Sequence, residues 1–366
     1  MPTHGRIELI DIIRGISILL VIMGHLPSVF GYGGPLSDLS LFRMPLFFFI
    51  SGTVFSLNKP TTIFVLQKTD QLLKPYFVTL FALVALETVL THQLPLQAIM
   101  GVIYGNRDTI EWKPLWYLTH LWLVFIFCFL FSKSIQLFHK SLFQKSLVIS
   151  TLFLTGYFIS YSLSPISVSL PIFQEGANPN TSSGLPFRME SLFISASFFL
   201  AGSITKERVK NYQPNIVYAA FSAIVFLMIA ILTPAYVDIG KGEYRYPWYS
   251  LPASVAGIYL VVYVSYFINR TVFAKRWLIL CGESSLFILI FHWFVQFKAY
   301  AILTKFFGEE FVVINSIISF LLGVFIPVMI RFVVRMSPLL SIFYLPVVGK
   351  PISIQLIRKP IKVDYS

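Results

Sequence analysis

Hydrophobic residues in this chain come in long runs that short polar or proline-containing segments separate. A run of about 20 predominantly apolar residues is long enough to cross a lipid bilayer as a helix. The pattern therefore predicts an all-α fold, a polytopic integral membrane helical bundle of about ten transmembrane helices. The predicted spans are residues 8–30, 40–57, 75–91, 114–132, 146–163, 188–204, 214–233, 249–268, 277–298 and 311–333.

The composition supports a membrane protein. The 366 residues are 56% hydrophobic and 12% charged, with 37 Phe and a mean hydropathy of +0.77. A soluble protein would carry about twice this charged fraction. The first apolar run lacks a small-residue cleavage site, which predicts a retained span and not a signal peptide. Cys128 and Cys281 both fall inside predicted spans, so a disulfide scaffold is not expected.

The distribution of basic residues predicts the orientation. Of the 28 Lys and Arg residues, 19 lie on the side of the two termini, 8 lie on the opposite side, and Arg14 lies within the first span. The positive-inside rule then places both termini in the cytoplasm. The net charge of +12 follows from this topology and faces anionic lipid headgroups, so no nucleic acid is expected as a partner.

The chain is expected to form one membrane domain over residues 1–336. Residues 337–366 are expected to form a short basic cytoplasmic tail, because they are too few to fold alone. The segment 165–186 contains several Gly, Pro, Asn and Ser residues and is expected to form an external loop.

The first predicted span carries an arginine and a histidine. Arg14 and His25 are 11 residues apart, about three helical turns and about 16 Å of rise, so they lie on one stripe. Asp11 precedes Arg14 by one turn and can pair with it. Ionisable groups at membrane depth usually face a protein interior and mark a functional site. The alternative is a helix-end ion pair of Asp11 with Arg14, with His25 at the far interface.

The predicted orientation sorts the other polar residues into two groups. The inner group consists of Asp11, Arg14, Lys68, Lys74 and Glu283. The outer group consists of His25, Glu87, His120, Arg188, Glu190 and His292, with Asp38 and Arg43 in or beside the first outer loop. An inner basic pocket suits a phosphorylated donor. Outer histidines and carboxylates suit general acid–base chemistry on an external hydroxyl or amine.

Several short motifs resemble those of the membrane-bound acyltransferase family 3, in the branch of the fucose 4-O-acetylases and polysaccharide O-acetyltransferases. The resemblance covers about residues 6–300, and its motifs occur in the same order and spacing. The motifs are the Arg14 to His25 pair, Arg43–Gly52 (RMPLFFFISG), Leu72–Tyr76 (LLKPY), Pro114–Leu118 (PLWYL), Phe198–Gly202 (FFLAG), and Gly282–Leu286 (GESSL) with His292. One departure is Gln71, which stands where the family commonly has an arginine.

The resemblance implies an O-acyltransferase in a bacterial cytoplasmic (inner) membrane. It would move an acetyl group from cytoplasmic acetyl-CoA to a hydroxyl of an envelope sugar, in an O-antigen, an exopolysaccharide or a lipid-linked glycan, and needs no metal. Arg14 would bind the donor and His25 would act as general base. Lys68, Lys74 and Glu283 are the further donor-side candidates. The acceptor-side candidates are Asp38, Arg43, Glu87, Trp116, Tyr117, His120 and His292. Direct transfer and an acyl-histidine intermediate are both chemically allowed.

Two other functions are compatible with the buried charges. A transporter or flippase would use Arg14 and His25 as a relay, and a membrane sensor would use them to bind an acyl or glycan ligand without turnover. The absence of visible repeat symmetry and the ordered set of motifs favour the transferase.

Overall fold

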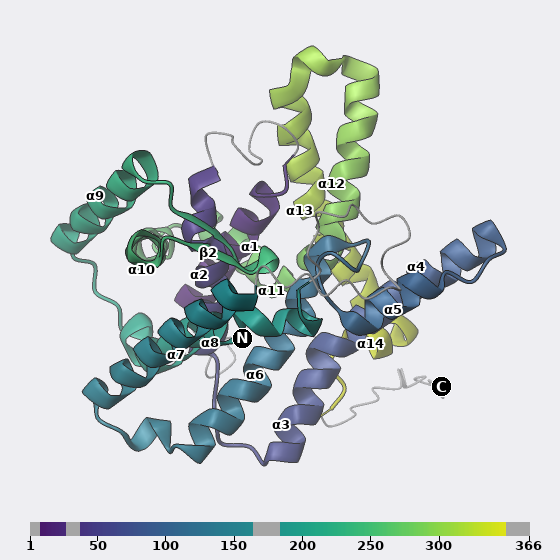
Figure 1. Ribbon diagram of the computed structural model, residues 1–366. Helices are drawn as coiled ribbons and strands as arrows, with labels where there is room; N and C mark the ends of the chain where they lie inside the picture. Colours follow the sequence, from purple (N-terminus) through teal and green to yellow (C-terminus); the bar gives the residue numbers. More distant parts are fainter. Residues whose placement is uncertain (1–7, 27–36, 164–183, 349–366) are drawn as a thin grey trace, which may run out of the picture.

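Each of the ten predicted hydrophobic segments contains a helix in the structure, a computed structural model (Figure 1). The structure describes residues 8–26, 37–163 and 184–348. The end of the first predicted span, most of the predicted external loop and most of the predicted tail lie outside these residues. The one sheet among them is an antiparallel hairpin of β1 (Tyr236–Asp238) and β2 (Glu243–Arg245). The prediction of an all-α, polytopic helical bundle is confirmed.

The α-helices are α1 (Glu8–Met23), α2 (Ser40–Thr53), α3 (Thr61–Lys68), α4 (Lys74–Thr91), α5 (Leu96–Tyr104), α6 (Trp116–Ser134), α7 (Leu142–Leu163), α8 (Leu192–Lys210), α9 (Ile216–Leu232), α10 (Pro247–Ile268), α11 (Phe273–Glu283), α12 (Ser285–Phe307), α13 (Val312–Met336) and α14 (Pro338–Tyr344). The 3₁₀ helices are η1 (Ser37–Leu39), η3 (Lys113–Leu115), η4 (Leu137–His139), η6 (Pro186–Ser191), η7 (Ile239–Lys241) and η8 (Glu309–Phe311), and η2 (Thr69–Leu73) is a π-helical segment.

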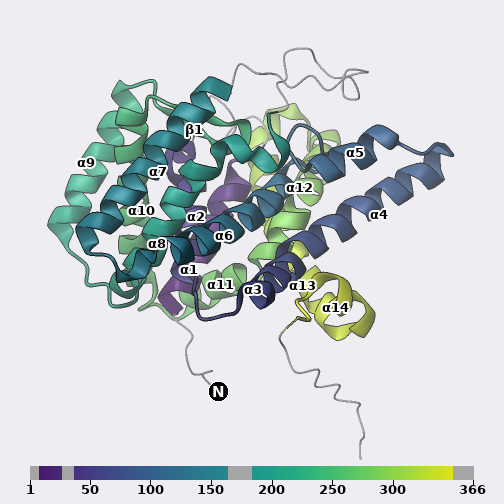
Figure 2. The ribbon, with the colours of Figure 1, turned by 60° about the horizontal axis from the view of Figure 1, so that its bottom comes forward.

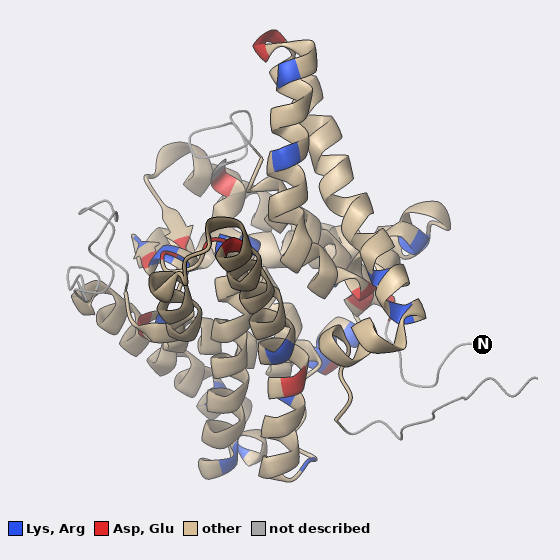
Figure 3. Ribbon diagram, turned by 90° about the vertical axis from the view of Figure 1, so that its right-hand side faces the viewer, with Lys and Arg blue, Asp and Glu red and all other residues tan. Residues whose placement is uncertain are grey.

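Seven helical segments among the described residues are long and apolar enough to cross a membrane. They are Thr61–Thr91, Lys113–Ser134, Leu142–Leu163, Pro186–Lys210, Pro247–Ile268, Ser285–Phe307 and Glu309–Met336. The helices α1, α2 and α9 are shorter, with 16, 14 and 17 residues. Many charged residues lie at helix ends and in connecting segments (Figure 3), as expected when lipid surrounds the middle of a bundle.

Two predicted boundaries were wrong. The third span begins at Thr61 and not at Pro75, because α3, η2 and α4 form one continuous helix. The π-helical turn Thr69–Leu73 ends two residues before Pro75, and such a turn accommodates a residue that cannot donate a helical hydrogen bond. The ninth predicted span is two helices, α11 and α12, which meet at Ser284.

The first helix lies inside the bundle. It contacts α2, α8, α10, α11, α12 and α13, and Figure 2 shows these helices grouped around it. Nine of its 16 residues are buried, and they lie on every side of the helix. A helix that is buried all round is a core helix and not a lipid-facing one. This position explains how a membrane domain can hold Arg14 and His25, because protein groups and not lipid surround them.

Close helix crossings depend on glycines of the sequence motifs. A Cβ at Gly52 of α2 would collide with the carbonyl oxygen of Phe199, and a Cβ at Gly202 of α8 would collide with that of Phe49. The helices α1 and α11 cross in the same way, through Gly15 and Gly282. Small residues let membrane helices approach closely where lipid gives no hydrophobic force between them. The glycines of these motifs therefore have a packing role.

We expect the substitution Gly52→Ala to destabilise the protein. The added methyl would lie against the backbone of α8, which cannot move as a side chain can, and overpacking typically costs about 1–3 kcal/mol. A matched control is Gly323→Ala in α13, where the nearest atom to a Cβ is 3.5 Å away and alanine favours the helix. Thermal unfolding in detergent should show a lower Tm for Gly52→Ala alone. Equal Tm values for the two variants would contradict the close crossing.

Candidate functional site

Two basic side chains lie near the N-terminal part of α1. Arg14 lies 3.8 Å from Asp11. The charges of Lys59 and then of Arg14 act electrostatically on Lys68 of α3. The ammonium of Lys68 lies 3.8 Å from the centre of the Phe125 ring and donates to Oε1 of Gln71 at 3.2 Å. Positive charge gathered inside a protein attracts an anion.

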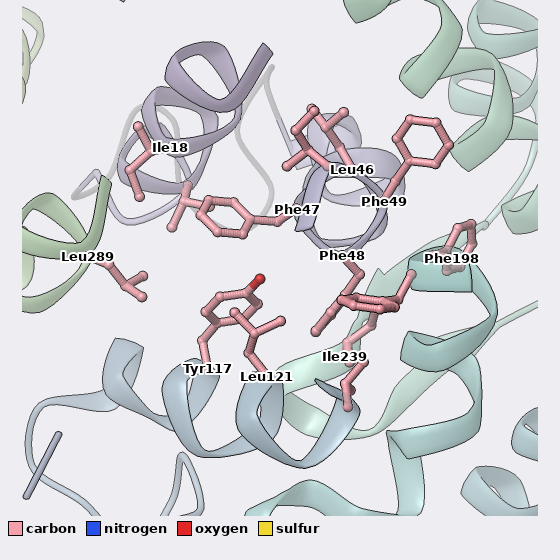
Figure 4. Packing of buried hydrophobic residues seen from close by; sticks show 14 of the residues in the cluster. Ile18, Leu46, Phe47, Phe48, Phe49, Tyr117, Leu121, Phe198, Ile239 and Leu289 are labelled. Atoms are coloured by element: carbon pink, nitrogen blue, oxygen red, sulfur yellow. The ribbon is translucent and has the colours of Figure 1, made fainter. Parts of the chain in front are cut away.

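A polar path continues from Arg14 along the interior. Ser17 is fully buried, and its hydroxyl has no hydrogen-bond partner in the part of the chain that the structure describes. Tyr117 of α6 is also buried, its hydroxyl lies beside Ser51 without a full hydrogen bond, and the charge of Arg14 acts on it. Figure 4 shows Tyr117 pointing from α6 toward Phe47 of α2. These hydroxyls can donate to a polar ligand that enters from the Arg14 end.

The other end of the stripe holds a pair of histidines. His25 lies two residues after the end of α1 and is partly exposed. Its ring centre lies 5.5 Å from that of His292 in α12 and 5.2 Å from that of Trp293, which meets it at 88°. The structure thus brings together two residues that the sequence placed in the same outer group.

The hydrogen bonds of His292 define its protonation. Nδ1 lies 2.7 Å from the carbonyl oxygen of Ile288 and 3.0 Å from that of Leu289. Because a carbonyl oxygen only accepts, Nδ1 carries the proton and Nε2 has a free lone pair. Nε2 is fully buried and has no partner among the described residues. A ring nitrogen held in this state is ready to accept a proton or a hydrogen bond.

Two arginines surround the His25 end. The guanidinium of Arg43 lies directly on Gly24, where a Cβ would collide with it. Arg43 and Arg107 both act electrostatically on His25. Arg107 is itself held by Asp238, whose carboxylate oxygens accept from Nη1 at 3.0 and 2.8 Å. The His25 end of the site thus carries positive charge from two neighbouring arginines.

A buried ion-pair cluster closes the same end of the bundle. Arg188 has left-handed backbone angles (φ 56°) and is 1% exposed. It pairs with Asp108 and, at 3.1 Å, with Glu190. Burial and then the Glu190 carboxylate raise the pKa of Tyr104, which donates to the carbonyl of Gly184 at 2.7 Å. Arg188 and Glu190, predicted on the outer side, thus serve to hold η6 in place.

His120 has a different setting from His25 and His292. Its Nδ1 donates to the carbonyl of Phe187 and its Nε2 accepts from the hydroxyl of Ser195, both at 2.8 Å. It is fully buried, next to the ring of Trp116. Both nitrogens are therefore engaged, and the first of these bonds supports the left-handed turn at Phe187 and Arg188.

Lys74 and Glu283 each bind a residue from a distant part of the chain. Lys74 pairs with Asp70 at 2.5 Å and donates to the carbonyl of Leu345 at 2.7 Å. These bonds attach the segment after α14 to η2. Glu283 accepts from Arg331 of α13 at 2.7 Å, at the junction of α11 and α12. The structure gives both residues partners that join helices.

The remaining acceptor-side candidates lie at the edges of the site. Asp38 is in η1, directly before α2, and Glu87 lines a hollow between α4 and α12. Four residues near the site are not apparent from the motifs: Trp293, Arg107, Ser17 and Gln296. Gln296 is fully buried one turn after His292. Trp293 and Gln296 are close to His292 in the sequence, and Ser17 is close to Arg14, so helical spacing could have indicated these three residues. No local pattern indicates that Arg107 approaches His25.

A comparison with protein families matches this chain to one of them. The model described as an acyltransferase domain matches residues 7–336. No curated protein and no solved structure matches the chain.

We expect His120→Ala to lower the stability of the folded protein, and not only its activity. The change leaves the Phe187 carbonyl and the Ser195 hydroxyl without their partner in a buried place, and each such group costs about 1–3 kcal/mol. The Tm in detergent should fall. A His120→Ala protein with unchanged Tm but no activity would show instead that His120 takes part in the reaction.

Proposed function

The chain belongs to the membrane-bound acyltransferase family 3, and from this premise we propose that it moves an acetyl group from cytoplasmic acetyl-CoA to a hydroxyl of an envelope sugar. It is a multi-pass membrane acyltransferase, and the membrane we propose is the bacterial inner membrane. The acceptor would be an O-antigen, an exopolysaccharide or a lipid-linked glycan.

The observation that carries the proposal is the histidine pair. The ring centres of His25 and His292 lie 5.5 Å apart. Arg14 lies about 16 Å from His25 along the axis of α1. A donor with a phosphate group at one end and a thioester at the end of a long arm matches this separation. Arg14 and Lys68 supply charge for the donor, while the histidines supply a base for the acceptor.

In the proposed reaction His25 takes the proton of the acceptor hydroxyl. The hydroxyl oxygen forms a bond to the carbonyl carbon of the thioester, and the carbon–sulfur bond breaks. The thiolate of CoA then receives the proton from the His25 imidazolium, which returns the enzyme to its starting state. A neutral imidazole is suited to this exchange near pH 7.

His292 would assist as a positioning residue. Its Nε2 lone pair has no other partner among the described residues, so it can accept a hydrogen bond from His25 once His25 is protonated. The backbone carbonyls of Ile288 and Leu289 hold the His292 ring in the required state. A base oriented by a second group is the usual arrangement in acyl transfer.

We expect His25→Ala to lower acetyl transfer by about 10²–10⁴-fold, the usual contribution of a general base. Donor binding and membrane insertion should remain. Arg14→Ala should instead raise the KM for acetyl-CoA or abolish its binding, because it removes charge from the anion site. Steady-state transfer and binding of acetyl-CoA to the purified protein measure the two effects. Near wild-type turnover by His25→Ala would transfer the role of base to His292.

We also expect donor and acceptor to enter from opposite faces of the membrane. The phosphates of CoA do not cross hydrocarbon cheaply, so the donor would bind from the cytoplasm and extend its thioester arm inward. Sealed inside-out vesicles should use externally added acetyl-CoA, and right-side-out vesicles should use it only after permeabilisation. Equal use by both intact preparations would show that both substrates bind from one face.

A further inference from the structure

A hollow of about 600 Å³ lies between α4 and α12, next to the segment that precedes η3. Its polar lining is Glu87 of α4, Glu111, and Lys298 of α12. Two carboxylates and one ammonium around a small space can accept hydrogen bonds from several hydroxyl groups and donate others. This polar set is the kind that recognises a sugar ring.

Aromatic rings also line the hollow, and one of them contacts His25, the proposed base. Trp112 stacks on Phe294 with ring centres 5.5 Å apart and an interplanar angle of 22°. Trp293 also lines the hollow, and its ring meets that of His25 at 5.2 Å. Trp293 therefore belongs both to the lining of the hollow and to the surroundings of His25.

The remaining lining is apolar and exposed. Leu86 is 55% exposed, Leu90 is 71% exposed and Phe297 is 41% exposed, and all three line the hollow. They belong to Thr61–Thr91 and Ser285–Phe307, two of the helical segments that are long and apolar enough to cross a membrane. Part of the lining is thus apolar and opens toward lipid, and part of it carries charge.

We propose that this hollow is the acceptor site and that the acceptor is an amphiphile, a hydroxyl-bearing sugar attached to a lipid chain. The inference rests on the proposed function and narrows its acceptor to the lipid-linked class. The carboxylates of Glu87 and Glu111 bind the sugar hydroxyls, and the aromatic rings contact its apolar C–H face. The lipid chain lies along Leu86 and Leu90 and reaches the site sideways from the bilayer. A polymer in water would gain nothing from these exposed leucines.

Two neighbouring positions on α4 provide a matched test. Leu90→Cys places a thiol in the hollow, whereas Val89→Cys places one at a similarly exposed position, 68% against 71%, that does not line it. The natural Cys128 and Cys281 are buried. Each variant is expressed in the native host without its own copy of the gene, and unsealed membranes are treated with a bulky maleimide. Transfer from radiolabelled acetyl-CoA to the endogenous envelope material is then measured.

Labelling should lower the incorporation of radioactivity at least tenfold in the Leu90→Cys membranes and leave it unchanged in the Val89→Cys membranes. Both labelled proteins should still bind acetyl-CoA. Equal incorporation, or equal loss, in the two labelled variants would overturn the acceptor site. Absence of incorporation in untreated wild-type membranes would instead refute the proposed function, so the two failures are distinguishable.

The class of acceptor has its own readout. In wild-type membranes, the earliest radioactive product should partition into organic solvent and become water-soluble after mild acid releases the sugar from its lipid. Early radioactivity confined to water-soluble or insoluble polymer would overturn the amphiphilic acceptor. Glu87→Gln with Glu111→Gln should lower the initial rate roughly tenfold or more, since hydrogen bonds to charged groups are worth about 1.5–3 kcal/mol. The matched control is Glu310→Gln, which changes an exposed carboxylate in η8, between α12 and α13. Equal initial rates for the control and for the double variant would contradict the role of Glu87 and Glu111.

Discussion

A guanidinium inside a membrane domain has to be surrounded by protein, and Arg14 imposes this requirement on the whole bundle. Six helices contact α1, and two of the closest crossings in the protein rest on glycines, at Gly15 with Gly282 and at Gly52 with Gly202. Hydrocarbon gives membrane helices no hydrophobic reason to associate, so close backbone contact and polar groups have to supply the attraction. Close packing around α1 thus stabilises the bundle and also allows Arg14 to lie inside the membrane domain.

Enclosure also separates two kinds of chemistry along one helix. The Arg14 end has basic side chains that attract an anion, whereas the His25 end has two imidazoles and the nearby charges of Arg43 and Arg107. About 16 Å of helix lies between them. The transfer across the membrane that we propose would use this separation, which a single helix keeps constant.

Irregular backbone occurs where polar groups need to be placed. The π-helical segment Thr69–Leu73 lies directly after Lys68 and holds Gln71. The break at Ser284 receives the guanidinium of Arg331 at 3.0 Å. The left-handed pair Phe187 and Arg188 meets His120 and two carboxylates. In a regular helix the 3.6-residue period fixes the direction of each side chain. An irregular segment changes that direction and can place a polar group where the period would not.

The amino-acid sequence by itself determined the class of the fold and the stripe on α1, because apolar run length and the 3.6-residue period act locally. It also indicated Lys68 beside Arg14 and His292 with His25, through their predicted depths. Only the tertiary structure decided that Lys74, Glu283 and His120 hold other elements in place, and that Trp293 and Arg107 approach His25. Whether a histidine nitrogen is free or already bonded depends on carbonyls and hydroxyls from distant elements, such as Phe187 and Ser195 at His120, and no local period encodes those contacts.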